Sequence, residues 1–199
     1  MQATDPRSDE ALMLAYRDGD AEAFDLLYGR WRGGLYRYLL RQAGAPAAAE
    51  EMYQDVWLKV IGARGRYEVT AKFSTWLFRI AHNHLVDHWR RSGREIVEET
   101  EVFDAADGEG DPPPDPLAAA SASPDETPER RCERGQLAAD LVAAIAGLPA
   151  VQRDAFLMAE EGGMTLDEIA AATGTGRETV KSRLRYALAK LRTQLGHWR

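Results

Sequence analysis

The sequence lacks several features that would place it in common classes of protein. Its 199 residues include a single cysteine, Cys132, so no disulfide can form within the chain. No apolar run approaches the roughly 18 to 20 residues that a membrane-spanning helix needs. The first residues, MQATDPRSDEALM, are too polar and acidic for a signal peptide. We therefore expect a cytoplasmic protein without disulfides and without membrane insertion.

Patterns typical of enzymes are also scarce, since we find no glycine-rich phosphate loop and no nucleophile–base pair. The exception is AHNHLVDHWRR, residues 81–91, in which His84 and His88 have the helical spacing of two zinc ligands. A zinc hydrolase would need a third ligand, and outside this stretch the only histidine is His197. We predict no catalytic residue, metal or cofactor, and a zinc hydrolase remains the least favoured alternative.

Positive charge is scarce overall but concentrated in two regions. The net charge is −7, yet residues 95–129 hold twelve acidic side chains and no Lys or Arg. Outside that stretch 25 basic and 20 acidic side chains remain, a net charge of +5. Residues 30–94 carry twelve basic and five acidic side chains, and residues 177–199 carry seven and one. Two basic regions around an acidic one favour a nucleic-acid partner.

The acidic stretch has the composition of a linker. It is rich in proline and like charge and poor in large apolar residues, so it cannot bury enough surface to order itself. We expect a disordered linker over residues 94–130, between an N-terminal domain of residues 1–93 and a C-terminal domain of residues 131–199.

Both domains are predicted to be helical, which makes the fold class all-α. In the N-terminal domain, apolar residues recur at helical spacing over 24–39, 52–60 and 74–89, and no segment alternates as a strand does. We expect a four-helix domain here. The inner face of the last helix is predicted to consist of Leu77, Ile80, Ala81, Leu85 and His88.

Start and stop signals divide the C-terminal domain into helices as well. Pro149 is predicted to start a helix that Gly162 and Gly163 end. Capping boxes are predicted at Thr165–Glu168 and Thr175–Glu178. The stripe that precedes Pro149 is predicted to point inward through Leu137, Leu141, Ile145 and Leu148.

The segment LDEIAAATGTGRETVKSRLR, residues 166–185, has the pattern of a helix-turn-helix. Ala170 is small where two helices must approach, Gly174 falls in the turn, and Val180 faces the first helix. A plain helical hairpin with a solvated charged face is the alternative, but the caps, the turn glycine and the positive charge favour DNA binding. Glu178 is interpreted as a helix cap or as an acceptor from a cytosine amino group.

A polar face along residues 74–91 suggests binding to unpaired bases. Trp76, Arg79, Asn83, Asp87 and Arg90 share this face at helical spacing. An aromatic ring can stack on a base, an amide can read a base edge, and arginine can hold a phosphate. An ordinary solvated face is the alternative. Further aromatic and basic groups lie next to this face: Tyr67, Lys72, Phe73 and Arg91.

Taken together, the motifs resemble the bacterial sigma factors of RNA polymerase, in particular the extracytoplasmic-function (ECF) group of the sigma-70 family. Four segments carry the likeness, in this order and on both sides of the linker. They are Gly19-Asp20-x-x-Ala23-Phe24, AAAEEMYQDVWLKV at 47–60, FSTWLFRIAHNHLVDHWRR at 73–91 and MTLDEIAAATGTGRETVKSRLRYALAKLR at 164–192.

The resemblance implies a protein that directs core RNA polymerase to promoters by binding rather than by catalysis. Its implied partners are the clamp helices of the largest polymerase subunit, the flap of the second, promoter DNA and an anti-sigma factor. The residues implied to dock on core polymerase are Glu51, Gln54, Asp55 and Leu58. Those implied to bind and melt the −10 element are Tyr67, Lys72, Phe73, Trp76, Arg79, Asn83, Asp87, Arg90 and Arg91. Those implied to bind the −35 duplex are Arg177, Thr179, Lys181, Ser182, Arg183 and Arg185, with Arg183 partly directed toward the scaffold as the alternative.

The main rival is a helix-turn-helix regulator that binds duplex DNA alone and does not dock on polymerase. Such a protein would not need the face that runs from Trp76 to Arg90. Cys132, next to the linker, is interpreted either as incidental or as a redox or metal sensor.

Overall fold

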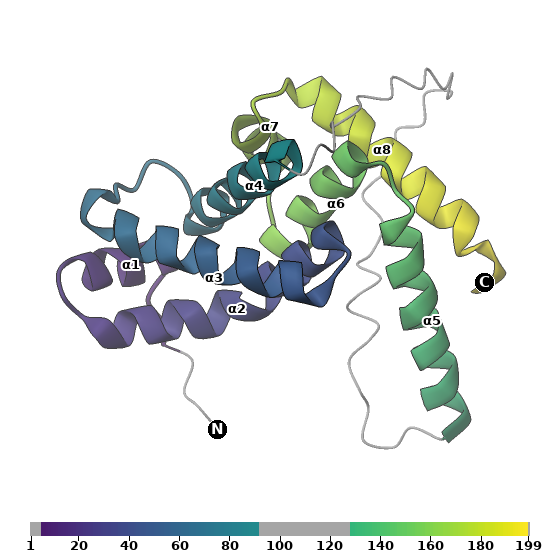
Figure 1. The fold of residues 1–199 in the computed structure, drawn as a ribbon, viewed down its shortest axis with the longest axis horizontal. Coiled ribbons are helices and arrows are strands. Elements are labelled where there is room, and N and C mark those ends of the chain that lie inside the picture. Colours follow the sequence, from purple (N-terminus) through teal and green to yellow (C-terminus); the bar gives the residue numbers. More distant parts are fainter. Residues whose placement is uncertain (1–4, 92–127, 199) are drawn as a thin grey trace.

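A computed structural model describes residues 5–91 and 128–198, and among these residues the only regular elements are helices (Figure 1). The predicted all-α fold with two helical domains is confirmed. Residues 94–127 of the predicted linker lie outside the described residues. The N-terminal half contains α1 (Asp9–Arg17), α2 (Ala21–Ala43), α3 (Pro46–Ala63), the 3-10 helix η1 (Arg64–Arg66) and α4 (Phe73–Arg91). The C-terminal half contains α5 (Pro128–Ala146), α6 (Ala150–Gly162), α7 (Leu166–Thr173), α8 (Arg177–Gln194) and the 3-10 helix η3 (Gly196–Trp198).

Local sequence sets both ends of α2. Asp20 is its N-cap, and the carboxylate accepts a hydrogen bond from the N–H of Ala23 at 3.2 Å. Gly44 is its C-cap, with a left-handed backbone at φ 73° that a residue with a Cβ would adopt at a cost. Pro46 then occupies the first turn of α3, where a missing N–H is not needed.

The inner face of α4 differs in part from the predicted one. Leu77, Ala81 and Leu85 are buried as predicted, but Ile80 and His88 are only half-buried. Side chains that the prediction did not include complete the buried face, because α4 is covered by α3 on one flank and by α7 on another. These additional buried residues are Phe73, Ser74, Thr75, Phe78, His84 and Trp89.

In the C-terminal half, α6 packs on α8, and Ile145 and Leu148 from the end of α5 join the core. The predicted inward position of Leu137 is wrong, since this side chain is 36% exposed. Its part of α5 extends away from the body of the protein, as Figure 1 shows, so no other helix of the described residues covers it. Val142 on the same helix is also exposed.

One of the two predicted capping boxes forms. Thr165 accepts from the N–H of Glu168, whose carboxylate accepts from the N–H of Thr165 at 2.8 Å. The second prediction is wrong because Gly176 is the N-cap of α8 and provides no side-chain hydrogen bond. The hydroxyl of Thr175 instead lies 2.9 Å from that of Thr173, across the turn.

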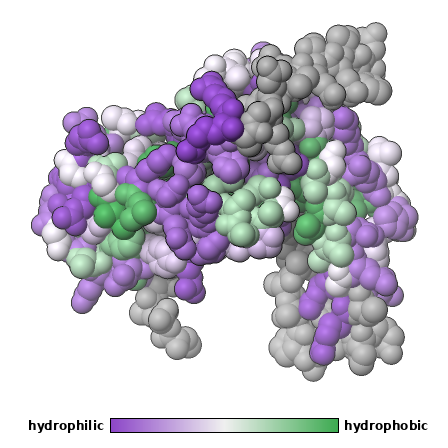
Figure 2. All heavy atoms as spheres, viewed as in Figure 1, coloured by the Kyte–Doolittle hydropathy of each residue, from purple (hydrophilic) through white to green (hydrophobic). Residues whose placement is uncertain are grey.

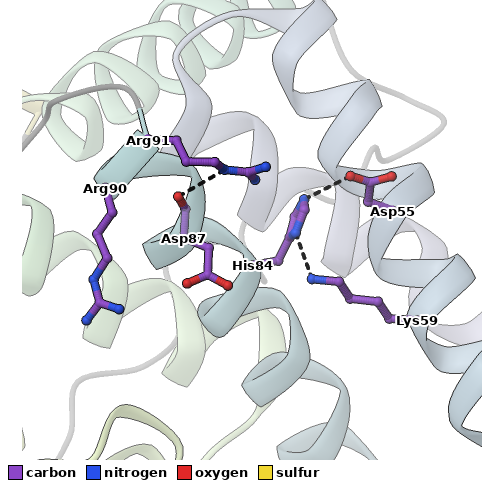
Figure 3. A pocket seen from close by; sticks show the side chains of 6 residues that line it. All are labelled: Asp55, Lys59, His84, Asp87, Arg90 and Arg91. Carbon is purple, nitrogen blue, oxygen red and sulfur yellow. Dashed lines mark hydrogen bonds and ion pairs between the residues drawn. The ribbon is translucent and has the colours of Figure 1, made fainter.

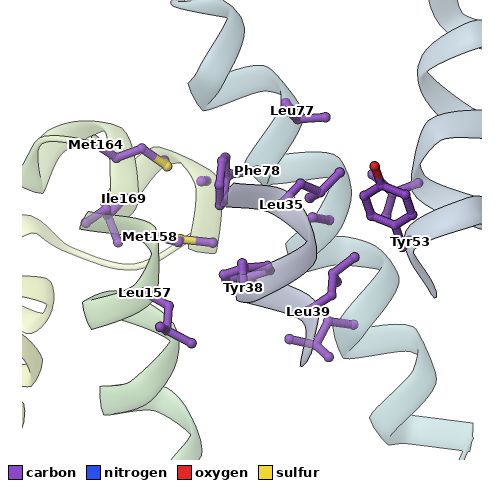
Figure 4. Close-up of a cluster of buried hydrophobic side chains, with 14 of the residues drawn as sticks. Leu35, Tyr38, Leu39, Tyr53, Leu77, Phe78, Leu157, Met158, Met164 and Ile169 are labelled. Atoms are coloured by element: carbon purple, nitrogen blue, oxygen red, sulfur yellow. The ribbon is translucent and has the colours of Figure 1, made fainter. Parts of the chain in front are cut away.

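The two halves share one apolar core, an arrangement that the sequence did not predict. α2 packs against α6, and α4 packs against α7. Figure 4 shows Phe78 of α4 beside Met158 and Met164 of the C-terminal half, with Tyr38 of α2 close by. The described halves are therefore in direct contact through buried side chains.

Candidate nucleic-acid and polymerase interface

The outward face of α4 contains most of the predicted −10 residues. Arg79, Asn83, Asp87 and Arg90 are exposed, as is Arg91 at the end of the helix. The opposite face is buried, so the rigid helix presents an amide, a carboxylate and three guanidinium groups to solvent. Basic residues in its last turn also interact favourably with the negative end of the helix dipole.

The predicted aromatic groups lie deeper than an open base-stacking surface would require. Tyr67 and Phe73 are 3% and 0% exposed, and Trp76 is half-buried with its ring centroid 5.0 Å from that of Tyr67. Burial, with smaller effects of Glu10 and Asp9, raises the pKa of Tyr67 to about 12, so this phenol is neutral. The rings of Tyr67 and Phe73 pack against Trp76 and do not face solvent.

A polar pocket lies between α3 and α4, at the C-terminal end of α4 (Figure 3). Nζ of Lys59 lies 2.9 Å from Nδ1 of His84, and Nε2 of His84 lies 3.3 Å from a carboxylate oxygen of Asp55. The guanidinium of Arg91 donates to the backbone carbonyl of Asp87 at 3.2 Å. The pocket brings together predicted docking and −10 residues, with Asp55, Lys59, His84, Asp87, Arg90 and Arg91 as its lining.

The partners of His84 define its protonation. An ammonium can only donate, so Nδ1 accepts from Lys59 and the ring proton sits on Nε2, facing Asp55. Burial first, and then the charge of Lys59, lower the pKa of His84, which keeps the ring neutral. Sequence reasoning considered His84 only as a metal ligand. Asp55 and Lys59 are four residues apart and so lie on one face of α3. This spacing was the signal in the sequence that α3 offers polar partners to His84.

The zinc alternative finds no site in the described part of the chain. Both nitrogens of His84 already face protein groups, and one of these is a cation. Within residues 5–91 and 128–198, no three His, Cys, Asp or Glu side chains come together as a metal site. The side chain of Cys132 lies outside the described atoms.

The predicted docking face lies along α3. Glu51 and Gln54 are exposed, and Leu58 exposes 64% of its surface to solvent. Ile61 extends the apolar surface toward the end of the helix, and Figure 2 shows an apolar patch there on a mostly hydrophilic face. Asp55 is half-buried and directed toward His84.

The predicted recognition helix, α8, presents a mixed set of predicted −35 residues. Arg177, Thr179, Lys181 and Arg185 are exposed, whereas Ser182 and Arg183 are half-buried. The guanidinium of Arg185 lies 5.1 Å from the centroid of the Tyr186 ring, which restricts its orientation.

The other charged groups at the start of α8 are paired on the surface. Arg177 pairs with Asp167 of α7 at 3.2 Å, and Glu178 lies 3.8 Å from Lys181. Glu178 therefore faces its neighbouring cations and is not half of a capping box.

Comparisons with known proteins identify both halves. Residues 27–95 match sigma-70 region 2, and residues 138–191 match sigma-70 region 4. The chain is 32% identical to the ECF RNA polymerase sigma factor RpoE of Cereibacter sphaeroides, over 93% of each chain. It is 30% identical to the RNA polymerase sigma-H factor of Pseudomonas aeruginosa, over 88% of each. The fold resembles that of the sigma factor RpoE from Bartonella quintana, solved with the anti-sigma factor NepR, at a TM-score of 0.61 and 22% identity, covering 88% of this chain and 98% of that one.

The chain therefore belongs to the sigma-70 family of RNA polymerase sigma factors, in its ECF group. Its function is that of a sigma factor in transcription initiation. None of its described helices combines the length and the apolar character needed to cross a bilayer.

Proposed function

We propose that the N-terminal domain, residues 1–93, captures the −10 element of promoters while the C-terminal domain, residues 131–199, reads the −35 duplex. The observation that carries this proposal is the division of α4 into a buried face and an exposed face that bears Arg79, Asn83 and Arg90. Because one face of α4 is packed in the core, the exposed side chains on the other face keep fixed positions relative to one another. Recognition of unstacked bases requires such fixed positions.

The buried rings refine the roles of the −10 residues. Arg79, Arg90 and Arg91 contact phosphates, Asn83 reads a base edge, and Asp87 orients the arginines. Trp76 offers the exposed part of its ring for stacking, supported from below by Tyr67 and Phe73. On α8, the exposed Arg177, Thr179, Lys181 and Arg185 contact the −35 duplex, and Ser182 and Arg183 contribute from the edge of the same face.

We propose that core RNA polymerase docks on α3 through Glu51, Gln54 and Leu58. The support is the apolar surface that the exposed side chains of Leu58 and Ile61 form on α3 beside polar neighbours, since an exposed apolar patch with a polar rim is typical of protein interfaces. Asp55 contributes less directly, because it already faces His84. We place the protein in the cytoplasm, where it acts by binding and without catalysis, and we include an anti-sigma factor among its partners because RpoE of Bartonella quintana was solved with one.

The test is transcription by bacterial core polymerase on fragmented genomic DNA of the source organism, with sequencing of transcript 5′ ends. The expected result is a set of starts that share spaced −35 and −10 elements and disappear without the protein. The variant Asn83→Ala should lose these starts while retaining core binding, and Asp25→Ala, an exposed change on α2, should keep them. Absence of protein-dependent starts with active core would overturn the proposal.

A further inference from the structure

Two neighbouring residues of α2, Arg30 and Trp31, hold the first turn of α1 through one shared carboxylate. That carboxylate belongs to Asp9, the first residue of α1. One of its oxygens accepts a hydrogen bond from the guanidinium of Arg30 at 2.6 Å, and the other accepts from the indole N–H of Trp31 at 2.8 Å. Since α1 packs along α2 (Figure 1), α1 cannot turn about its own axis without breaking one of these bonds.

The same guanidinium holds the backbone that leads into α1. It donates to the carbonyl oxygen of Arg7 at 2.9 Å and to that of Asp5 at 2.6 Å. Ser8, the next residue along, is the N-cap of α1, and its hydroxyl accepts from the N–H of Ala11 at 3.2 Å. An isolated exposed ion pair contributes little to stability, but the side chain of Arg30 is only 28% exposed and makes three hydrogen bonds. One side chain of α2 therefore sets the position of the whole first turn of α1.

The residue after Asp9 connects α1 to α4. Glu10 leaves α1 in another direction, because successive side chains of a helix are rotated by about 100°. Its carboxylate accepts from the backbone N–H of Phe73, the first residue of α4, at 2.7 Å. The rotation of α1 about its axis decides whether Glu10 reaches this N–H, and Asp9 fixes that rotation. A chain of contacts thus runs from Arg30 of α2 through the first turn of α1 to the start of α4.

The second partner of Asp9 reaches the same turn of α4 by apolar contact. The ring centroid of Trp31 lies 6.4 Å from that of Phe73 and 6.2 Å from that of Phe78. The ring of Phe73 lies in turn 5.8 Å from that of Trp76, the aromatic member of the proposed −10 surface. Both oxygens of the Asp9 carboxylate therefore bond to groups that connect to the first turn of α4, residues 73–76.

We propose that Arg30 is a positioning residue for −10 recognition. It orients α1 through Asp9, so that Glu10 fixes the first turn of α4 and with it the position of Trp76. Arg30 acts through these protein contacts and does not touch DNA, since its guanidinium is already bonded to three acceptors of the chain. The contacts stand by themselves, whereas their consequence for promoters rests on the function proposed above for α4.

Two variants separate positioning from a direct contact between Arg30 and DNA. Arg30→Met removes both the bonds to α1 and a positive charge. Asp9→Asn also breaks the shared contact, because an amide cannot accept at both of its atoms, but it makes the protein less negative. Electrostatic attraction to DNA therefore does not weaken in Asp9→Asn. Arg32→Met is the matched control, since Arg32 is an exposed arginine of α2 that takes no part in these bonds.

The first measurement is hydrogen exchange of backbone amides in the free, full-length protein, followed by mass spectrometry. Peptides that contain residues 73–76 should exchange about fivefold faster in Arg30→Met and Asp9→Asn, which is the effect expected for loss of one helix cap. Arg32→Met should exchange as the starting protein does. Peptides from α6 report global unfolding and should not change in any variant. Unchanged exchange in residues 73–76, or an equal increase in α6, would overturn the positioning role.

The second measurement is promoter opening by the holoenzyme, detected with permanganate. Arg30→Met and Asp9→Asn should both reduce opening, while affinity for core polymerase and for the −35 duplex stays unchanged. Adding Glu10→Ala to Arg30→Met should cause no loss beyond that of the more severe single variant, because Arg30 acts through Glu10.

Two outcomes would refute the role of Arg30 in opening. Full opening by Asp9→Asn, with a loss only in Arg30→Met, would indicate that Arg30 contacts DNA directly. Losses that multiply in the double variant would indicate that Arg30 and Glu10 act separately. Because hydrogen exchange uses no polymerase, a starting protein that directs no transcription would refute the proposed function and leave the connection from α2 to α4 intact.

Discussion

The carboxylate of Glu10 accepts a hydrogen bond from the backbone N–H of Phe73 at 2.7 Å. This bond connects the first turn of α1 to the first residue of α4, sixty-three positions later. The amino end of a helix has N–H groups without partners inside the helix and carries a partial positive charge. A carboxylate from another helix therefore acts as the cap of α4 and fixes where this helix, which carries the proposed −10 residues, starts.

Removal of this cap should destabilise the N-terminal domain. We expect Glu10→Ala to lower the free energy of unfolding at pH 7 by about 1 kcal/mol. Burial alone would raise the pKa of Glu10, but the hydrogen bond from Phe73 and smaller contributions lower it below its ordinary 4.5. The stabilisation is therefore present above pH 4.5 and is lost as the pH falls through the lowered folded-state value. Urea titrations at pH 7 and pH 3.5 should show the difference shrinking, and Glu51→Ala should have a much smaller effect at pH 7.

His84 should make stability depend on pH near neutrality. Its pKa in the folded state is lowered from 6.5, mainly by burial and then by Lys59, so the unfolded chain takes up the proton more readily. Stability is thus fully present above pH 6.5 and falls between pH 6.5 and the lowered value. In His84→Gln this part of the pH profile should flatten. Urea titrations of both proteins at several pH values check it, and identical profiles would contradict the neutral ring between Lys59 and Asp55.

Asn83 offers a cleaner test of the −10 face than Trp76. Trp76 packs against Tyr67 and Phe73, so its removal would disturb the fold as well as the DNA contact. Asn83 is exposed, and Asn83→Ala should reduce promoter opening while thermal stability and core binding stay unchanged. Permanganate footprinting of unpaired thymines measures the opening. If this variant opens the promoter as the wild type does, Asn83 does not belong to the proposed −10 surface.

Arg185 should contribute to −35 binding if its guanidinium reaches a base edge. We expect Arg185→Ala to weaken binding to the duplex element by ~1–3 kcal/mol. Arg192→Ala removes the same charge from the far end of α8, so it controls for a general loss of positive charge. Titration of labelled −35 duplex with the holoenzyme measures both variants, and equal losses would indicate electrostatic attraction without base recognition.

The exposed leucine of α3 should matter for polymerase and not for folding. Leu58→Ser removes an apolar side chain that already lies in solvent, so the free energy of unfolding should change little. Affinity for core polymerase should fall by about tenfold or more if the side chain is buried on docking. Val69→Ser, at another exposed apolar position, is the control. Calorimetric titration with core polymerase distinguishes the two.

Local patterns predicted most of the fold. Helical spacing and the Thr165–Glu168 capping box act within a few residues, and the structure follows them. The caps of α2, Asp20 and Gly44, are equally local, although they were not predicted. The Thr175–Glu178 prediction failed because Gly176 takes the cap position and the Thr175 hydroxyl turns to Thr173. Spacing alone does not say which of two adjacent residues begins a helix.

The candidate site was harder to predict wherever burial depends on distant residues. The exposed arginines of α4 follow from its periodicity, but Tyr67 and Phe73 were placed at the surface because the loop around them is polar. Phe73 is covered by α1 and α2, through Glu10 and Trp31, and Tyr67 packs in turn against Phe73. The bond between Tyr38 and Asp154 joins residues 116 positions apart, and no local pattern marks such a pair.

The continuous core also bears on what a cut in the chain would do. Tyr38 and Phe78 are covered by α6 and its neighbours, and Met158 and Met164 are covered in return, so each half shields apolar surface of the other. Covalent continuity between residues 91 and 128 is then not what keeps the halves together. A protease that cleaves there would release no free domain. It would leave two fragments that remain bound to each other, so a severed sigma factor would still behave as one particle.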